Sequence, residues 1–138
     1  FTFSLFGLLP IFVPLTIYLL NFEPSLAPRA ALIIFANEAI CGAIKLLYKK
    51  ERPAPMPANN LFQLYMARGF PSIHTARITV FAVIMGILSR NPAVAAAGVL
   101  LIIAVAFSRI YLKKHDIKDV TAGIILGILA YFAVQYIV

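Results

Sequence analysis

Two histidines and an aspartate carry the chemistry that this sequence could perform. His115 is followed four residues later by Asp119, and in a helix that begins near His115 this spacing places both side chains on one face. A carboxylate in that position accepts the Nδ1–H of the imidazole and leaves Nε2 with a free lone pair. A histidine oriented in this way acts as a base or as a nucleophile. Metal ligation is the alternative, but no third ligand in the sequence has convincing spacing.

Three cations and one helix start could hold a tetrahedral anion beside these groups. Lys45 and Arg52 are separated by six residues, and Arg109 directly follows a long apolar run. An arginine offers a planar fork that matches two phosphate oxygens. Ser72 is a good N-cap for the next apolar segment, His74 lies in its first turn, and a helix N-terminus binds anions. One histidine would attack phosphorus and the other would protonate the leaving oxygen, which is phosphoryl transfer.

Long apolar segments must position these residues. The chain has 138 residues, of which 62% are hydrophobic and only 12% charged, and its mean hydropathy is +0.95. A water-soluble chain of this length could not bury so much apolar surface. We therefore expect an all-α integral membrane protein that forms a single membrane-embedded domain over residues 1–138. A spanning helix needs about 20 apolar residues, and five runs qualify: about 1–20, 27–48, 72–89, 92–110 and 116–138.

The order of these runs predicts where the polar residues meet. Each helix crosses the membrane once, so the second and fourth helices end on the face where the third and fifth begin. The stretches 45–53, 71–77 and 108–119 therefore share one membrane face. Five crossings thus predict an active site at one face of a helix bundle. The first run lacks a basic leader and a small-residue cleavage site, so we do not interpret it as a signal peptide.

The long connection at about 49–71 contains two different parts. Its first part holds Pro53, Pro55 and Pro57 and cannot be a regular helix. The later segment, residues 59–70, is either a short amphipathic helix at the interface or a plain loop. In the helical interpretation its apolar side chains face the lipid, and these are Phe62, Leu64, Tyr65 and Phe70.

Charges inside the apolar segments need partners. Arg77 lies one turn into its helix, where a charge is costly. Glu38 lies in the middle of another helix and is either functional or a hydrogen-bonded carboxylate that packs two helices together. Lys49 and Lys50 are expected to anchor the chain at the interface. Possible contacts to a lipid head group are Arg77, Arg68 and Lys114.

The balance of charge limits the partners. Lysine and arginine number 12 against 5 aspartate and glutamate, which gives a net charge of +7. The basic residues lie between apolar runs, so the partners we expect are the bilayer and an anionic lipid or phosphate, and not nucleic acid.

Gly123 and Gly127 form a weak GxxxG signal for helix packing. The single cysteine, Cys41, lies in an apolar run and is expected to be a buried hydrophobe.

The three polar stretches together resemble the signature of a known family. They read K-x6-RP, PSxH and SR-x5-H-x3-D over residues 45–119. This pattern is similar to that of the type-2 phosphatidic acid phosphatase superfamily of membrane lipid phosphatases. The resemblance implies that His115 is a nucleophile that forms a phosphohistidine, oriented by Asp119, and that His74 is the general acid. It implies no metal or other cofactor, and four residues that bind the phosphoryl oxygens: Lys45, Arg52, Ser72 and Arg109.

Two departures from the family pattern stand out. Ile73 occupies a position where the family usually has glycine, and its bulk restricts the turn. Family members usually have six membrane helices, whereas five are counted here, so an upstream helix is absent from this sequence or the protein is a minimal version.

Among small bacterial members, the short chain and additional cations favour a lipid A phosphatase that acts at the 1 position. Undecaprenyl diphosphate and phosphatidylglycerophosphate are the alternative substrates.

The side of the membrane on which the site lies is predicted differently by two arguments. The positive-inside rule places a face rich in lysine and arginine in the cytoplasm. The family resemblance implies a multi-pass protein of the bacterial inner membrane whose site faces the periplasm, and cations selected for phosphate binding weaken the rule. We therefore expect a periplasmic site.

Alternative functions are a non-enzymatic transporter or binding subunit for anionic lipid, and a lipid phosphotransferase.

Overall fold

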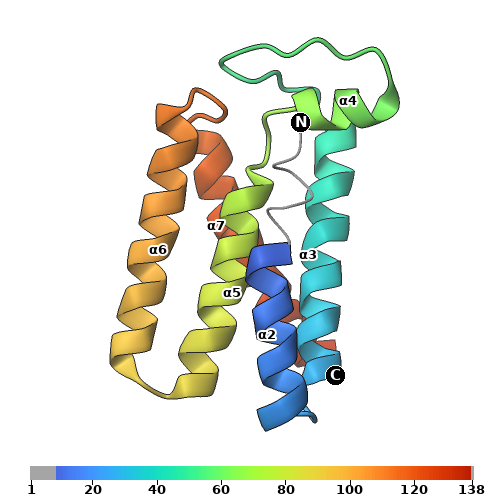
Figure 1. The fold of residues 1–138 in the computed structure, drawn as a ribbon. Helices are drawn as coiled ribbons and strands as arrows, with labels where there is room; N and C mark the ends of the chain where they lie inside the picture. The colour runs from blue at the N-terminus through green and yellow to red at the C-terminus, as the bar shows by residue number, and fades with distance from the viewer. Residues whose placement is uncertain (1–8, 138) are drawn as a thin grey trace.

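The computed structural model describes residues 9–137, and within them the chain is entirely helical apart from loops and one isolated β-bridge (Figure 1). This confirms the predicted all-α class. The helices are α2 (Leu9–Phe22), α3 (Ala27–Leu47), α4 (Leu61–Ala67), α5 (Ile73–Ser89), α6 (Pro92–Tyr111) and α7 (Ile117–Ile137).

The five expected membrane segments correspond to α2, α3, α5, α6 and α7. Helices α3, α6 and α7 are long and apolar enough to cross a membrane, and α2 and α5 are shorter apolar helices. Residues 1–8 of the first expected run lie outside the described part of the chain. The chain is therefore a membrane protein, as its composition predicted.

The short α4 decides between the two interpretations of the long connection, because residues 59–70 contain a real helix. Asn60 caps it by accepting a hydrogen bond from the N–H of Gln63 at 2.8 Å, and the Gln63 side chain accepts the N–H of Asn59 at 2.7 Å. Of the side chains expected to face lipid, that of Phe62 lies outside the described ones. Leu64 and Tyr65 are half-buried, so α4 packs onto the end of the bundle.

Helix α5 lies at the centre of the bundle and contacts α2, α3, α6 and α7 (Figure 1). The main apolar core consists of Phe12, Leu15, Leu19, Ala30, Ile33, Val80, Ile84 and Val134. Helix α6 has no buried residue and packs on α5 through small side chains, with Gly98 against Ala82. Its large apolar side chains stay exposed, which suits a helix surrounded by lipid.

The glycines of the GxxxG signal lie at the contact between α7 and α5. A Cβ at Gly123 would come within 2.5 Å of the Ser72 carbonyl oxygen, and one at Gly127 within 2.7 Å of the Ala76 carbonyl oxygen. No other residue type fits so close to a neighbouring backbone. The weak signal therefore marked a real contact, which brings the start of α5 against the first turns of α7.

An ion pair joins α3 to α5 within the bundle. Both oxygens of Glu38 accept hydrogen bonds from Arg77, from Nε and from Nη2, each at 2.7 Å. The hydrogen-bonded, packing interpretation of Glu38 is therefore confirmed. Because Arg77 is buried and engaged with Glu38, the geometry lends no support to the expected contact between Arg77 and a lipid head group.

Candidate active site

The three polar stretches meet at one end of the bundle, where α3 and α6 end and α5 and α7 begin and where α4 lies over the end of α3 (Figure 1). We call this the site end. Backbone hydrogen bonds join the stretches there: the Ser72 N–H donates to the Asp119 carbonyl at 2.9 Å, and the Gly69 N–H donates to the Lys50 carbonyl at 2.8 Å. Residues far apart in the sequence are thus held side by side, as the count of crossings predicted.

His115 lies in the short turn between α6 and α7 and is only 2% exposed. Its backbone N–H donates to the Arg109 carbonyl at 3.2 Å, and the left-handed backbone at Lys113 (φ 53°) reverses the chain. Burial, together with the charges of Lys45 and Arg52, lowers the pKa of His115 to about 4 although Asp119 opposes this. The imidazole is therefore neutral at pH 7, with one ring nitrogen carrying a lone pair.

Asp119 faces His115 at a longer distance than a hydrogen bond. The Nδ1 atom of His115 lies 3.6 Å from Oδ2 of Asp119, and this nitrogen has no hydrogen-bond partner among the described residues. Asp119 is completely buried. The predicted i, i+4 pair therefore exists as a contact between a histidine and a carboxylate, but in this structure the two groups are not hydrogen-bonded.

Asp119 has a second, structural role at the start of α7. Its Oδ2 accepts the N–H of Asp116 at 3.0 Å, and Oδ1 of Asp116 accepts the N–H of Asp119 at 3.0 Å. This reciprocal pair is a capping box, which satisfies two N–H groups that the helix leaves unpaired. The cap fixes the direction of the Asp119 carboxylate toward His115.

Lys50 lies between the two capping carboxylates. Its Nζ atom is 2.6 Å from Oδ2 of Asp116 and 2.6 Å from Oδ1 of Asp119. The sequence interpretation of Lys50 as an interface anchor was therefore wrong, because the ammonium group turns toward the site. No local pattern could have identified it, since 66 and 69 residues separate the partners.

Lys45 also turns inward. It is 2% exposed in the last turn of α3, and its Nζ donates to the carbonyl oxygen of Arg68 at 2.8 Å. The ammonium group lies 5.6 Å from the centre of the Tyr65 ring in α4. Lys45 therefore does not extend to the membrane surface, and α4 helps to fix its position.

Arg52 and Arg109 approach each other although both are positively charged. Burial and the charge of Arg109 both lower the pKa of Arg52. The Nε atoms of the two guanidinium groups are buried and lack hydrogen-bond partners among the described residues. Buried donors without acceptors are costly, and two adjacent cations repel each other. A bound anion would relieve both costs.

Ser72 and His74 lie at the N-terminus of α5. Ser72 occupies the N-cap position with an extended backbone, but its side chain makes no capping hydrogen bond. Its Oγ instead lies 2.9 Å from Oγ1 of Thr75. His74 is half-buried and close enough to Arg109, Arg52 and His115 for their charges to act on it. The structure therefore brings both histidines into one cationic site.

The remaining predicted positions lie at the edge of the site or in the core. Ile73 is buried against Cys41 and Ala76, so the bulk that replaces the family's glycine is accommodated in the core. Lys114 is exposed beside the site. Arg68 offers its carbonyl to Lys45 and lines a cavity of about 140 Å³ with Glu51, Pro55, Met56, Ala58, Leu64 and Ala67.

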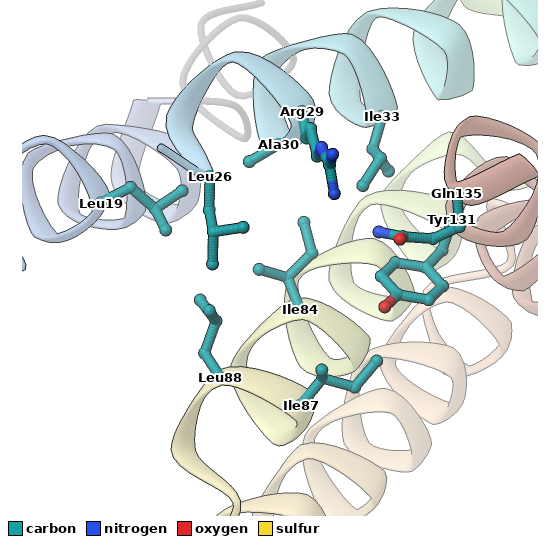
Figure 2. A pocket seen from close by; sticks show the side chains of 10 residues that line it. All are labelled: Leu19, Leu26, Arg29, Ala30, Ile33, Ile84, Ile87, Leu88, Tyr131 and Gln135. Atoms are coloured by element: carbon teal, nitrogen blue, oxygen red, sulfur yellow. The ribbon is translucent and has the colours of Figure 1, made fainter. Parts of the chain in front are cut away.

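A second cavity, of about 190 Å³, lies toward the opposite end of the bundle (Figure 2). Its wall is mostly apolar, with Ile84, Ile87 and Leu88 from α5, and Arg29 and Tyr131 also line it. None of the predicted site residues lines it, so this cavity is separate from the candidate site. Among the described residues no group of three or more histidine, cysteine, aspartate or glutamate side chains could hold a metal ion.

Two comparisons with known proteins agree with this geometry. A family model described as the PAP2 superfamily matches residues 27–138, which include all three polar stretches. The crystal structure of LpxE from Aquifex aeolicus matches with a TM-score of 0.76 and 25% sequence identity. This match covers 97% of the present chain and 81% of the other.

Proposed function

This chain belongs to the PAP2 superfamily, as its three-part signature predicted, and we propose that it hydrolyses a lipid-linked phosphate through a phosphohistidine on His115. The family match and the apolar helices make it a membrane lipid phosphatase.

In the first step Nε2 of His115 attacks phosphorus. A nitrogen–phosphorus bond forms as the bond between phosphorus and the lipid oxygen breaks, and His74 supplies a proton to that leaving oxygen. Lys45, Arg52 and Arg109 stabilise the charge on the phosphoryl oxygens, and Ser72 contributes the start of α5.

In the second step water hydrolyses the intermediate. The nitrogen–phosphorus bond breaks, inorganic phosphate leaves, and His74 takes a proton from the attacking water. Asp119 orients His115 in both steps by accepting its Nδ1–H, for which the present 3.6 Å separation must shorten to a hydrogen bond.

One observation carries the proposal: the Nε donors of Arg52 and Arg109 lack hydrogen-bond partners among the described residues, and the charge of Arg52 acts on a buried, neutral His115. Donors of this kind bind tetrahedral anions, and a neutral histidine is a nucleophile. A site that only bound an anionic lipid would need the cations but not a histidine with an aspartate facing it.

The substrate is proposed from the surroundings of the site. Exposed cations beside the site, among them Lys114, suit a head group with more than one phosphate. Together with the similarity to LpxE, this ranks lipid A 1-phosphate first, before undecaprenyl diphosphate and phosphatidylglycerophosphate. The site faces the periplasm of a bacterial inner membrane in this proposal.

The test is phosphate release by the purified protein in detergent, with the three lipids and phosphatidic acid offered separately in the presence of EDTA. We expect release from at least one lipid, and a loss of about 10³-fold or more in His115→Ala, because the nucleophile is removed. Ile110→Ala, at an exposed position near the end of α6, is the matched control. Unchanged release in His115→Ala would contradict the mechanism.

A further inference from the structure

Lys50 has a fixed position beside the proposed nucleophile. It follows the end of α3, its carbonyl accepts the Gly69 N–H at 2.8 Å, and its ammonium group bonds to Asp116 and Asp119, each at 2.6 Å. The K-x6-RP signature leaves position 50 unspecified. Lys50 is therefore a charged residue of the site to which the family pattern assigns no role.

Asp119 needs a partner of this kind. Its carboxylate is completely buried, Oδ2 is engaged by the Asp116 N–H, and Oδ1 bonds to Lys50. A buried carboxylate is costly unless a cation or several donors compensate for it. Among the described contacts, Lys50 provides the only ammonium or guanidinium hydrogen bond to Asp119.

We propose that Lys50 is a positioning residue for the reaction: it clamps the carboxylates of Asp116 and Asp119 so that Asp119 stays directed at Nδ1 of His115. This inference rests on the proposed function, since it concerns the histidine that would carry the phosphoryl group. The clamp matters most when His115 forms its bond to phosphorus, because the ring then gains positive charge and Nδ1–H needs a fixed acceptor.

The electrostatics of the clamp are consistent with this role. Burial by itself lowers the pKa of Lys50, but the hydrogen bonds to Asp116 and Asp119 raise it above the ordinary value. Burial acts to raise the pKa of Asp116, but the hydrogen bond and charge of Lys50, together with backbone hydrogen bonds from Asp119 and Lys118, lower it overall. Lys50 and Asp116 are therefore both charged at neutral pH. Since the ammonium group is engaged by two carboxylates, a direct role in binding phosphate is disfavoured.

The experiment compares Lys50→Met with Lys49→Met, which removes the neighbouring exposed lysine. Both variants are assayed for kcat and KM across pH. We expect Lys50→Met to lower kcat about 10²-fold with KM within about twofold, because a displaced orienting group mainly affects the transition state. Lys49→Met should match the wild type, and Lys50→Arg should restore much of kcat because its fork can also bridge two carboxylates.

The pH profile provides a readout that a purely structural role would not change. Without Lys50, the Asp119 carboxylate is no longer held against His115, so it contributes less to raising the pKa of that imidazole. The acid limb of kcat should therefore move to lower pH in Lys50→Met, and should stay in place in Lys49→Met.

A second variant tests the clamp from its other side. Asp116→Asn keeps an N-cap oxygen for α7 and removes one of the two carboxylates. We expect a small loss in Asp116→Asn alone, and a partial recovery when it is added to Lys50→Met, because it relieves the repulsion between the unclamped carboxylates. Thermal unfolding in detergent, followed for each variant, separates lost activity from lost folding.

The outcomes separate the clamp from the proposed function. If the wild type releases no phosphate, the function itself fails. If the wild type is active and His115→Ala is inactive, but Lys50→Met keeps kcat within about twofold at every pH, only the clamp is overturned. A raised KM with unchanged kcat would also overturn it, because Lys50 would then bind substrate. The clamp would also be overturned if the losses of kcat in Lys50→Met and Asp116→Asn simply multiplied in the double variant.

Discussion

A neutral histidine surrounded by cations is the central feature at the residue scale. His115 is buried beside Lys45 and Arg52, whose charges oppose the addition of a proton. The same cations bind phosphate in the proposed mechanism, so one arrangement serves two purposes. It attracts the substrate, and it keeps the nucleophile unprotonated before the substrate arrives.

This arrangement predicts the pH dependence of the reaction. Because the pKa of His115 is lowered to about 4, its lone pair is present above that pH and is lost as the pH falls through it. We expect an acid limb of kcat/KM in that range, and a separate basic limb where His74, which must carry a proton to act as the general acid, loses it in the free enzyme. In Arg52→Met the pKa of His115 should rise, so the acid limb should move to higher pH while the overall rate falls.

The measurement is kcat/KM from pH 3.5 to 8, for the wild type and for Arg52→Met, at approximately constant ionic strength. Lys49→Met is the control, because Lys49 is exposed and is not among the groups that lower the pKa of His115. An acid limb that stays in the same place in Arg52→Met would show that His115 does not set it.

At the scale of elements, the contact between α5 and α7 positions the site. Gly123 and Gly127 let the two backbones approach, and the Ser72 N–H then reaches the Asp119 carbonyl. The first histidine belongs to α5 and the second lies just before α7. A small separation of these helices would therefore move His74 away from His115.

Gly127→Ala tests this contact. The new Cβ would lie 2.7 Å from the Ala76 carbonyl oxygen and 2.9 Å from Thr79 Cβ, so α5 and α7 must move apart. We expect a loss of about 1–3 kcal/mol in the free energy of unfolding, as for other overpacked sites, together with reduced kcat. Thermal unfolding in detergent and phosphate release are the two measurements.

The matched control is another helical glycine. At Gly42 in α3 a Cβ would meet only Tyr65, at 3.9 Å, which is an ordinary contact. Gly42→Ala should therefore be neutral or slightly stabilising, since alanine favours helix over glycine by up to about 1 kcal/mol. Equal stability of both alanine variants would disprove the close contact between α5 and α7.

The ion pair between α3 and α5 makes a second prediction at this scale. Glu38→Gln leaves Arg77 as a buried charge without its carboxylate, which should cost about 3 kcal/mol in the free energy of unfolding. Arg77→Met combined with Glu38→Gln should be less destabilised than the sum of the single variants, because both partners of the ion pair are then removed together. Thermal unfolding of the four proteins measures this coupling, and additive losses would contradict it.

At the scale of the whole molecule, the chain is a membrane helix bundle with its polar chemistry gathered at one end. The loops at that end carry most of the cations, which would satisfy the positive-inside rule only if the site faced the cytoplasm. The site residues account for many of these charges, since Lys45, Lys50, Arg52 and Arg109 are directed inward or buried. The charge pattern is therefore not a reliable guide to orientation.

Orientation can be measured with single cysteines. Lys49→Cys at the site end and Glu23→Cys at the opposite end are both exposed, and Cys41→Ala removes the buried native thiol. In intact bacterial cells, a membrane-impermeant thiol reagent should label Lys49→Cys and leave Glu23→Cys unlabelled until the cells are lysed. The reverse pattern would place the site in the cytoplasm.

The sequence by itself determined the class of the protein, its helices and most of the proposed site. Hydropathy is a local property, so the apolar runs identified the membrane helices, and counting crossings predicted that three distant stretches share one end. The signature motifs supplied the residues of the expected site, and the family match confirmed the family to which they belong.

Only the tertiary structure decided how the side chains pair across the chain. It showed that Lys50 joins Asp116 to Asp119, that Lys45 bonds to the Arg68 carbonyl, and that Glu38 pairs with Arg77. These partners are 23 to 69 residues apart. A charged side chain carries no record in the sequence of which distant partner it will face, because that choice depends on how helices pack and which groups become buried together.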